Sequence, residues 1–144
     1  MHCNYYIAPG TLANLQRAFT EGYIWGLPGG PGGRRGTWRR LKTGDTVFYA
    51  QSPRSAVVAY GEIQNTFLDR TPFFPDDREG VTNWPLRFRF QIVLPPTDPL
   101  LGPGISVTDM FKFPRLKRFE NLTDTEGEDL LHRCEDQWRR SDVK

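Results

Sequence analysis

The sequence has few of the residues that usually carry covalent, metal or redox chemistry. Its 144 residues include two cysteines and two histidines. Cys3 and Cys134 are too few for a disulfide framework, so we expect a reducing compartment. His2 and His132 lie near these cysteines, but the adjacent His2 and Cys3 cannot easily direct both side chains at one ion. We therefore expect neither a disulfide nor a metal site.

Long apolar runs are also missing from the chain. No stretch approaches the roughly 18 apolar residues that a membrane-spanning helix needs. The start of the sequence lacks the charged-then-apolar order of a secretory signal. These absences predict a cytoplasmic protein with no membrane partner.

No group of residues predicts catalysis. The serines do not stand in a nucleophile-elbow motif. The glycine-rich residues 26–36 are not followed by the Gly-Lys-Ser/Thr of a phosphate-binding loop. Adjacent acidic pairs, such as Asp76 with Asp77, are typical of solvated surfaces. We expect no catalytic residue and no cofactor, and hence not an enzyme.

Positive charge is present, but it is unevenly spread. The net charge is +2, and residues 1–59 carry seven Lys/Arg against two Asp/Glu. The basic residues form two groups: Arg34, Arg35, Arg39, Arg40 and Lys42, and then Lys112, Arg115, Lys117 and Arg118. Local basic patches on a weakly charged chain are typical of a nucleic-acid-binding face. Solvated loop charge explains the same pattern equally well.

The order of patterns predicts one α+β domain over residues 1–144. Strands are expected at 4–8, 46–51, 56–64 and 86–94, with Pro9-Gly10 ending the first and a bulge or close approach at Gly61 in the third. A helix begins at Leu12 and ends at Gly22, one helical turn is expected at 37–42, and a capping box at 123–126 opens a terminal helix. Short strands mixed with short helices favour a curved sheet or small barrel.

The strand at 86–94 has the clearest alternation. Phe88 and Phe90 share one face with other apolar residues, and burial is the ordinary outcome for such positions. Arg87 and Arg89 are expected on the opposite face, where they contact either solvent or phosphates.

Residues 23–36 are the most informative part of the sequence. Trp25 stands beside a segment with bare backbone amides and arginines, so it could stack on a planar ligand while a polyanion approaches the main chain. A core tryptophan that seals a helix against the sheet is an equally good interpretation. Asn14, on the first turn of the preceding helix, could offer an amide donor and acceptor to a base edge, or could simply be exposed near the cap.

Taken in order, several segments resemble an EVE domain, a relative of the YTH and PUA-like folds. They include GYIWGLP at 22–28, LKTGDTVFY at 41–49 and WPLRFRF at 84–90, together with residues 6–8, 12–15 and 61–63. The resemblance extends over residues 4–140. It implies a twisted, barrel-like sheet flanked by short helices, and a modified base held unpaired or flipped in an aromatic cage.

The resemblance also implies roles for single residues. Trp25 matches the first cage aromatic, Gly26 a backbone contact to the base, and Asn14 a residue that reads the ring edge. Phe90 falls where YTH domains have a second tryptophan. The third wall is not assigned, and Leu100 and Leu101 are candidates.

We therefore expect a non-catalytic module that binds a modified base in nucleic acid. Methylated DNA is favoured as the partner and RNA is also compatible, because the resemblance extends to the DNA-recognition domains of archaeal McrBC-type restriction GTPases, where a GTPase or nuclease domain follows. The expected phosphate contacts are Arg34, Arg35, Arg39, Arg40, Lys117 and Arg118. Two alternatives stay open: a PUA-like module that reads RNA shape, and a protein-interaction or small-molecule-sensing domain.

Overall fold

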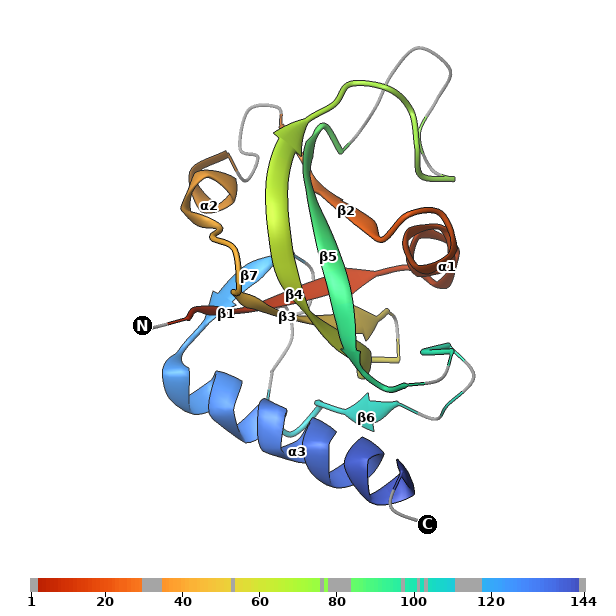
Figure 1. Cartoon of the computed structure of the whole chain (residues 1–144), viewed down its shortest axis with the longest axis vertical. Helices are drawn as coiled ribbons and strands as arrows, with labels where there is room; N and C mark the ends of the chain where they lie inside the picture. Colours follow the sequence, from red (N-terminus) through yellow and green to blue (C-terminus); the bar gives the residue numbers. More distant parts are fainter. Residues whose placement is uncertain are drawn as a thin grey trace.

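The computed structural model describes residues 3–29, 35–52, 54–75, 77, 84–96, 98–100, 102, 104–110 and 118–142, with the side chains of 139–142 left out. Within these ranges, seven strands and three helices are found (Figure 1). The strands are β1 Tyr5–Gly10, β2 Ile24–Leu27, β3 Thr46–Gln51, β4 Ala56–Leu68, β5 Leu86–Leu94, β6 Ile105–Ser106 and β7 Glu120–Leu122. The helices are α1 Leu12–Thr20, α2 Arg35–Arg40 and α3 Asp124–Asp142. This is the predicted α+β class, with a curled, half-barrel sheet and short flanking helices.

The strands form one mixed sheet in the order β2-β5-β4-β3-β1-β7, and β6 pairs with β4. β1 and β3 run parallel, and the other pairs are antiparallel. The hairpin of β3 and β4 and the strand β5 are confirmed. Gly61 is confirmed as a bulge site: the β4–β5 register shifts there, and a Cβ at Gly61 would lie 2.3 Å from the carbonyl oxygen of Gln91.

Three differences from the prediction concern strands. β1 continues through Pro9 and Gly10, which pair with Ala50 and Gln51 of β3. Because β7 covers only the stretch from Tyr5 to Ile7, the missing N–H of Pro9 breaks no bond on that side. β4 is longer than expected, and the short strands β2, β6 and β7 were not predicted. Four or fewer residues rarely show a readable period.

The sheet buries both of its faces, which explains the dense apolar run of β3. Val47 and Tyr49 point into one cluster, and Phe48 and Ala50 into another. The first cluster, here called the pocket face, includes Leu15, Ala18 and Phe19 of α1 and Trp25, Leu27, Phe74, Phe88, Phe90 and Phe119. The second, the helix face, packs under α3 through Leu130, Cys134 and Trp138.

The helix boundaries follow the capping residues. Thr11 Oγ1 accepts a hydrogen bond from the backbone N–H of Asn14 at the start of α1. Gly22, at a φ of +104°, turns the chain after the helix. The capping box before α3 is confirmed: the Thr123 amide donates to Glu126 Oε1 over 3.0 Å, and the Glu126 amide donates to Thr123 Oγ1 over 3.1 Å. In the part of the chain described, no helix has the length and apolar character to cross a membrane.

Candidate nucleobase pocket

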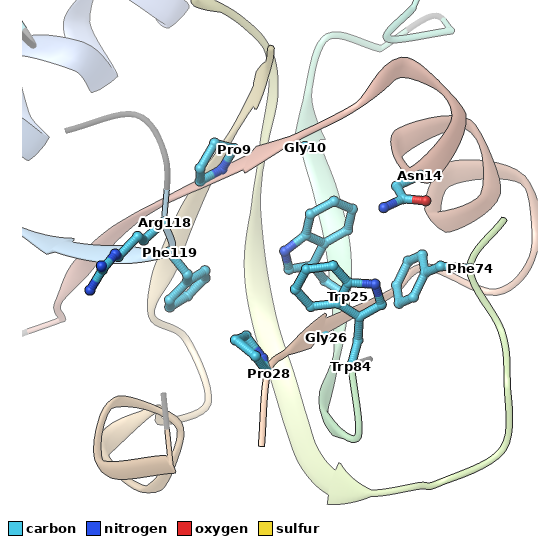
Figure 2. A pocket seen from close by; sticks show the side chains of 10 residues that line it. All are labelled: Pro9, Gly10, Asn14, Trp25, Gly26, Pro28, Phe74, Trp84, Arg118 and Phe119. Atoms are coloured by element: carbon cyan, nitrogen blue, oxygen red, sulfur yellow. The ribbon is translucent and has the colours of Figure 1, made fainter. Parts of the chain in front are cut away.

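A pocket of about 330 Å³ opens where the two ends of the curled sheet approach each other. One side comes from the end of β1, and the other from β2, which lie far apart in the strand order. The gap between these two parts, lined by Pro9, Gly10, Trp25, Gly26 and Pro28, is called the seam below. The lining is completed by Asn14, Phe74, Trp84, Arg118 and Phe119 (Figure 2).

Trp25 belongs to the core and to the pocket at once. Its side chain is 6% exposed, and its ring lies edge-on to Tyr49 at 6.0 Å and to Phe74 at 5.5 Å. The end of the indole also packs across the seam onto Gly10, where a Cβ would come within 2.4 Å of Cη2. The core interpretation of this residue is therefore confirmed, and its stacking on a ligand stays a prediction. Trp25 is fixed by core packing, and it still lines the opening.

Gly26 allows two other aromatics to close over β2. A Cβ at Gly26 would lie 2.7 Å from the Cβ of Trp84 and 3.3 Å from Cε2 of Phe74. These two residues are pocket walls to which the sequence prediction gave no role. A Trp-Pro pair immediately before β5, and two phenylalanines between prolines in a polar loop, were the available signals.

Asn14 is placed at the pocket by the first turn of α1. It is 7% exposed, and its amide faces the two indoles in Figure 2. The structure thus brings Asn14, Trp25 and Gly26 together, as the resemblance implied. Their contact with a base stays a prediction.

Phe90 corrects the predicted second wall. Its side chain is 2% exposed and packs in the core against Tyr49 at 4.6 Å and Tyr23 at 5.8 Å. It does not line the pocket, because it is packed against these two rings in the interior. Among the described residues, Trp25 and Phe90 therefore do not form the two facing walls that the resemblance implied. Leu100 lies away from this pocket, in a separate depression beside α1, and Leu101 falls outside the described residues.

The charge at the pocket is positive. Arg118, which is exposed, is the one charged side chain among the lining residues described. In Figure 2, α2 lies on the same side of the opening as Arg118, and it carries Arg35, Arg39 and Arg40. Arg39 and Arg40 are exposed, whereas Arg34 and Lys117 lie outside the described residues. Among those described, no three His, Cys, Asp or Glu side chains gather as metal ligands.

Comparison with solved structures identifies the architecture. The YTH domain-containing protein Mmi1, in a complex with RNA, superposes with a TM-score of 0.64 at 9% identity, over 99% of this chain and 88% of that one. The fold is that of YTH domains. The YTH domain of Pho92, solved in complex with m6A, gives 0.60 at 13% identity, over 92% of this chain and 83% of that one.

The likeness extends beyond proteins that carry the YTH name. A protein from Agrobacterium tumefaciens superposes with a TM-score of 0.56 at 20% identity, over 91% of this chain and 92% of that one. No protein-family model and no curated protein matches the sequence itself. The YTH-like fold is therefore shared by sequences that are too different for site residues to be transferred between them. The role of each residue must be judged from this chain's own geometry.

Proposed function

We propose that this chain is a non-catalytic module that holds one unpaired or extruded nucleobase, preferably a methylated one, in the pocket at the seam. The observation that carries the proposal is an open pocket in which Trp25, Phe74 and Trp84 meet a buried amide, that of Asn14. Flat aromatic walls favour a flat ligand, and an amide can donate to and accept from a base edge. Complexes of the similarly folded Mmi1 with RNA and of Pho92 with m6A support the same interpretation.

The size of the pocket favours a single base. About 330 Å³ stands at the low end of the roughly 300–1,000 Å³ that ligand pockets span. A ligand larger than one planar ring system would extend out of the seam. We therefore propose that the rest of the polynucleotide runs over the surface, toward Arg118 and the arginines of α2.

The charge at the rim separates this proposal from a methylammonium reader. Aromatic cages also bind quaternary ammonium groups and methylated lysines through cation–π attraction. Here the charged lining side chain, Arg118, would repel a cation and attract a phosphate. The rim thus favours nucleic acid over a methylated protein tail.

The magnitudes show where affinity must come from. Burying one methyl group contributes on the order of 1 kcal/mol, and stacking contributes about 1–3 kcal/mol per base. Extruding a paired base costs a few kcal/mol, so a base in a single strand binds more readily than one in a duplex. Phosphate contacts supply the remainder, and the affinity should fall as salt rises.

The direct test is fluorescence anisotropy with short labelled oligonucleotides. One set is RNA with or without a single N6-methyladenosine, and the other is single-stranded and duplex DNA with or without N6-methyladenine or 5-methylcytosine. A base reader prefers one modified strand several-fold. The DNA arms test whether methylated DNA is the target. A downstream GTPase or nuclease domain stays a separate proposal. Equal binding of modified and unmodified strands would favour a shape-reading module. Binding to none would favour a protein-interaction or small-molecule-sensing domain.

Trp84→Ala is the sharpest variant for this test. Trp84 is half-buried at the pocket, so its removal should lower modified-base affinity by about 1–3 kcal/mol while the protein stays folded. Arg89→Met is the matched control, because Arg89 is exposed on β5 and stacks over Phe67, outside the pocket lining.

A further inference from the structure

Arg87 is a buried cation on β5, between Leu86 and Phe88 of the pocket face. It lies on β5, where alternation predicted an outward side chain, yet it is 2% exposed. Burial lowers the pKa of its guanidinium, and the charges of Asp69 and Asp77 oppose that shift. A buried charge is tolerated only when it is paired and hydrogen-bonded. The contacts that satisfy Arg87 therefore show what the residue holds in place.

Arg87 contacts both segments that carry Trp84 and Phe74, the two pocket walls to which the sequence prediction gave no role. Nε donates to the carbonyl of Trp84 over 3.0 Å, and Nη2 donates to the carbonyl of Thr71. Nη1 lies 3.3 Å from Oδ2 of Asp69. One side chain thus connects Trp84, two residues before β5, to the segment that follows β4.

An aromatic chain carries this anchoring to Trp25. The Arg87 guanidinium lies over the ring of Phe73 at 5.6 Å, and Phe73 meets Phe74 edge-on at 4.8 Å. Phe74 in turn lies 5.5 Å from Trp25. The carboxylate of Asp77 fixes the same turn, since it accepts from the amides of Phe73 and Phe74.

We propose that Arg87 is a positioning residue of the pocket, which sets the spacing of the Trp84 and Phe74 walls through the carbonyls of Trp84 and Thr71 and through the ring of Phe73. Arg87 is not a phosphate contact, because its guanidinium is buried and faces protein carbonyls. A lysine cannot replace it fully, since one ammonium cannot match the planar, five-donor fork that reaches three separate oxygens. The effect on base binding rests on the proposed function, whereas the effect on Trp84 does not.

The first experiment needs no ligand. Protein labelled with 5-fluorotryptophan gives one fluorine signal for each of its four tryptophans, assigned with single Trp→Phe variants. We expect Arg87→Met to shift or broaden the Trp84 signal while that of Trp138, on the helix face, stays unchanged. Arg87→Lys should show a smaller change, and Arg89→Met none. An unchanged Trp84 signal in Arg87→Met would overturn the proposal; if that variant does not fold, an unchanged signal in Arg87→Lys has the same meaning.

The second experiment measures binding of the preferred modified oligonucleotide at several salt concentrations. We expect Arg87→Met to weaken it about ten-fold, equivalent to about 1.4 kcal/mol, through faster dissociation and with the salt slope kept. Arg118→Met should instead reduce the slope by about 0.7, as loss of one phosphate contact on a single strand does. A reduced slope for Arg87→Met would contradict a positioning role. If the wild type prefers no modified strand, the proposed function fails, and the fluorine signals still decide the role of Arg87.

Discussion

The two faces of the sheet are built from alternate residues of the same strands, yet they are closed in different ways. On the helix face, one long helix, α3, covers Phe48 and its neighbours through Leu130, Cys134 and Trp138. On the pocket face, the cover is assembled from α1, the segment around Phe74 and the residues before β7. The cover of the pocket face, made of several pieces, leaves the pocket open at the seam between β1 and β2.

This difference separates stability from recognition only in part. The helix face can be altered without touching the pocket, so its residues should change stability alone. Under the proposed function, the pocket face combines both tasks, because Trp25 packs on Tyr49 in the core and also lines the opening. Substitutions that compare the two faces can therefore test how closely the tasks are connected.

The largest expected effect is that of Trp25→Ala. Removing a tryptophan that is 6% exposed should destabilise the protein by about 3–5 kcal/mol, and it should also abolish modified-base preference in the molecules that stay folded. Denaturant unfolding and anisotropy measure the two outcomes. Trp138→Ala, with a 7% exposed tryptophan on the helix face, is the matched variant: a similar loss of stability with preference intact is expected. Loss of preference in Trp138→Ala would show that the faces are not independent.

A smaller effect is expected for Gly127→Ala in α3. A Cβ there would lie 2.2 Å from Cγ of Tyr5, so the helix must move away from β1. The destabilisation from overpacking, about 1–3 kcal/mol, should exceed the stabilisation of about 1 kcal/mol that alanine gives over glycine in a helix. Gly36→Ala in α2 is the control, because its Cβ would meet nothing closer than an arginine nitrogen at 3.8 Å. Thermal unfolding should show a lower Tm for Gly127→Ala and no such decrease for Gly36→Ala.

Tyr49→Phe should have a modest effect of the opposite sign. The Tyr49 hydroxyl is buried on the pocket face with no hydrogen-bond partner among the described residues. Removing an unsatisfied buried hydroxyl should raise the free energy of unfolding by about 1 kcal/mol. Tyr23→Phe, at an exposed tyrosine, should change nothing. A clear loss of stability in Tyr49→Phe would mean that the hydroxyl has a partner after all.

The smallest perturbation compares the two thiols. Burial raises the pKa of Cys134 well above its usual range, so the thiol on the helix face stays protonated at neutral pH. Cys3 is exposed. Mass spectrometry after brief treatment with iodoacetamide should therefore find alkylation at Cys3 and not at Cys134 until denaturant is added. Rapid labelling of native Cys134 would indicate that α3 opens readily.

The sequence predicted the parts of the fold that depend on local patterns. The alternation of 86–94, the apolar run of 46–51, the glycine of the β4 bulge and the capping box of α3 each leave a readable signal within a few consecutive residues of the sequence. The short strand β2 could not be found this way. It exists because it pairs with β5, and such long-range pairing leaves little trace in four residues.

The candidate site was predicted less well than the fold. Asn14, Trp25 and Gly26 were named through the resemblance to EVE and YTH domains; they line one pocket, and their contact with a base stays a prediction. Phe90 was wrongly assigned: it lies on the same face of the sheet as Trp25, but two residues beyond Phe88, the partner of Trp25, and it is buried against Tyr49. Trp84 lies in a segment between regular elements, where no period exists to place a side chain. Arg87 was also misplaced: it was expected to contact either solvent or phosphates, whereas its hydrogen bonds to the carbonyls of Trp84 and Thr71 hold it inside.

The position of Arg118 and Phe119 has a consequence for the order of events during synthesis. These two residues reach the seam because β7, directly after them, pairs with the first strand of the chain, and α3 then packs beside it. A nascent polypeptide that has emerged as far as residue 100 already contains Trp25 and Trp84 but still lacks two residues of the pocket lining. The pocket is thus completed late in translation, when β7 pairs with β1.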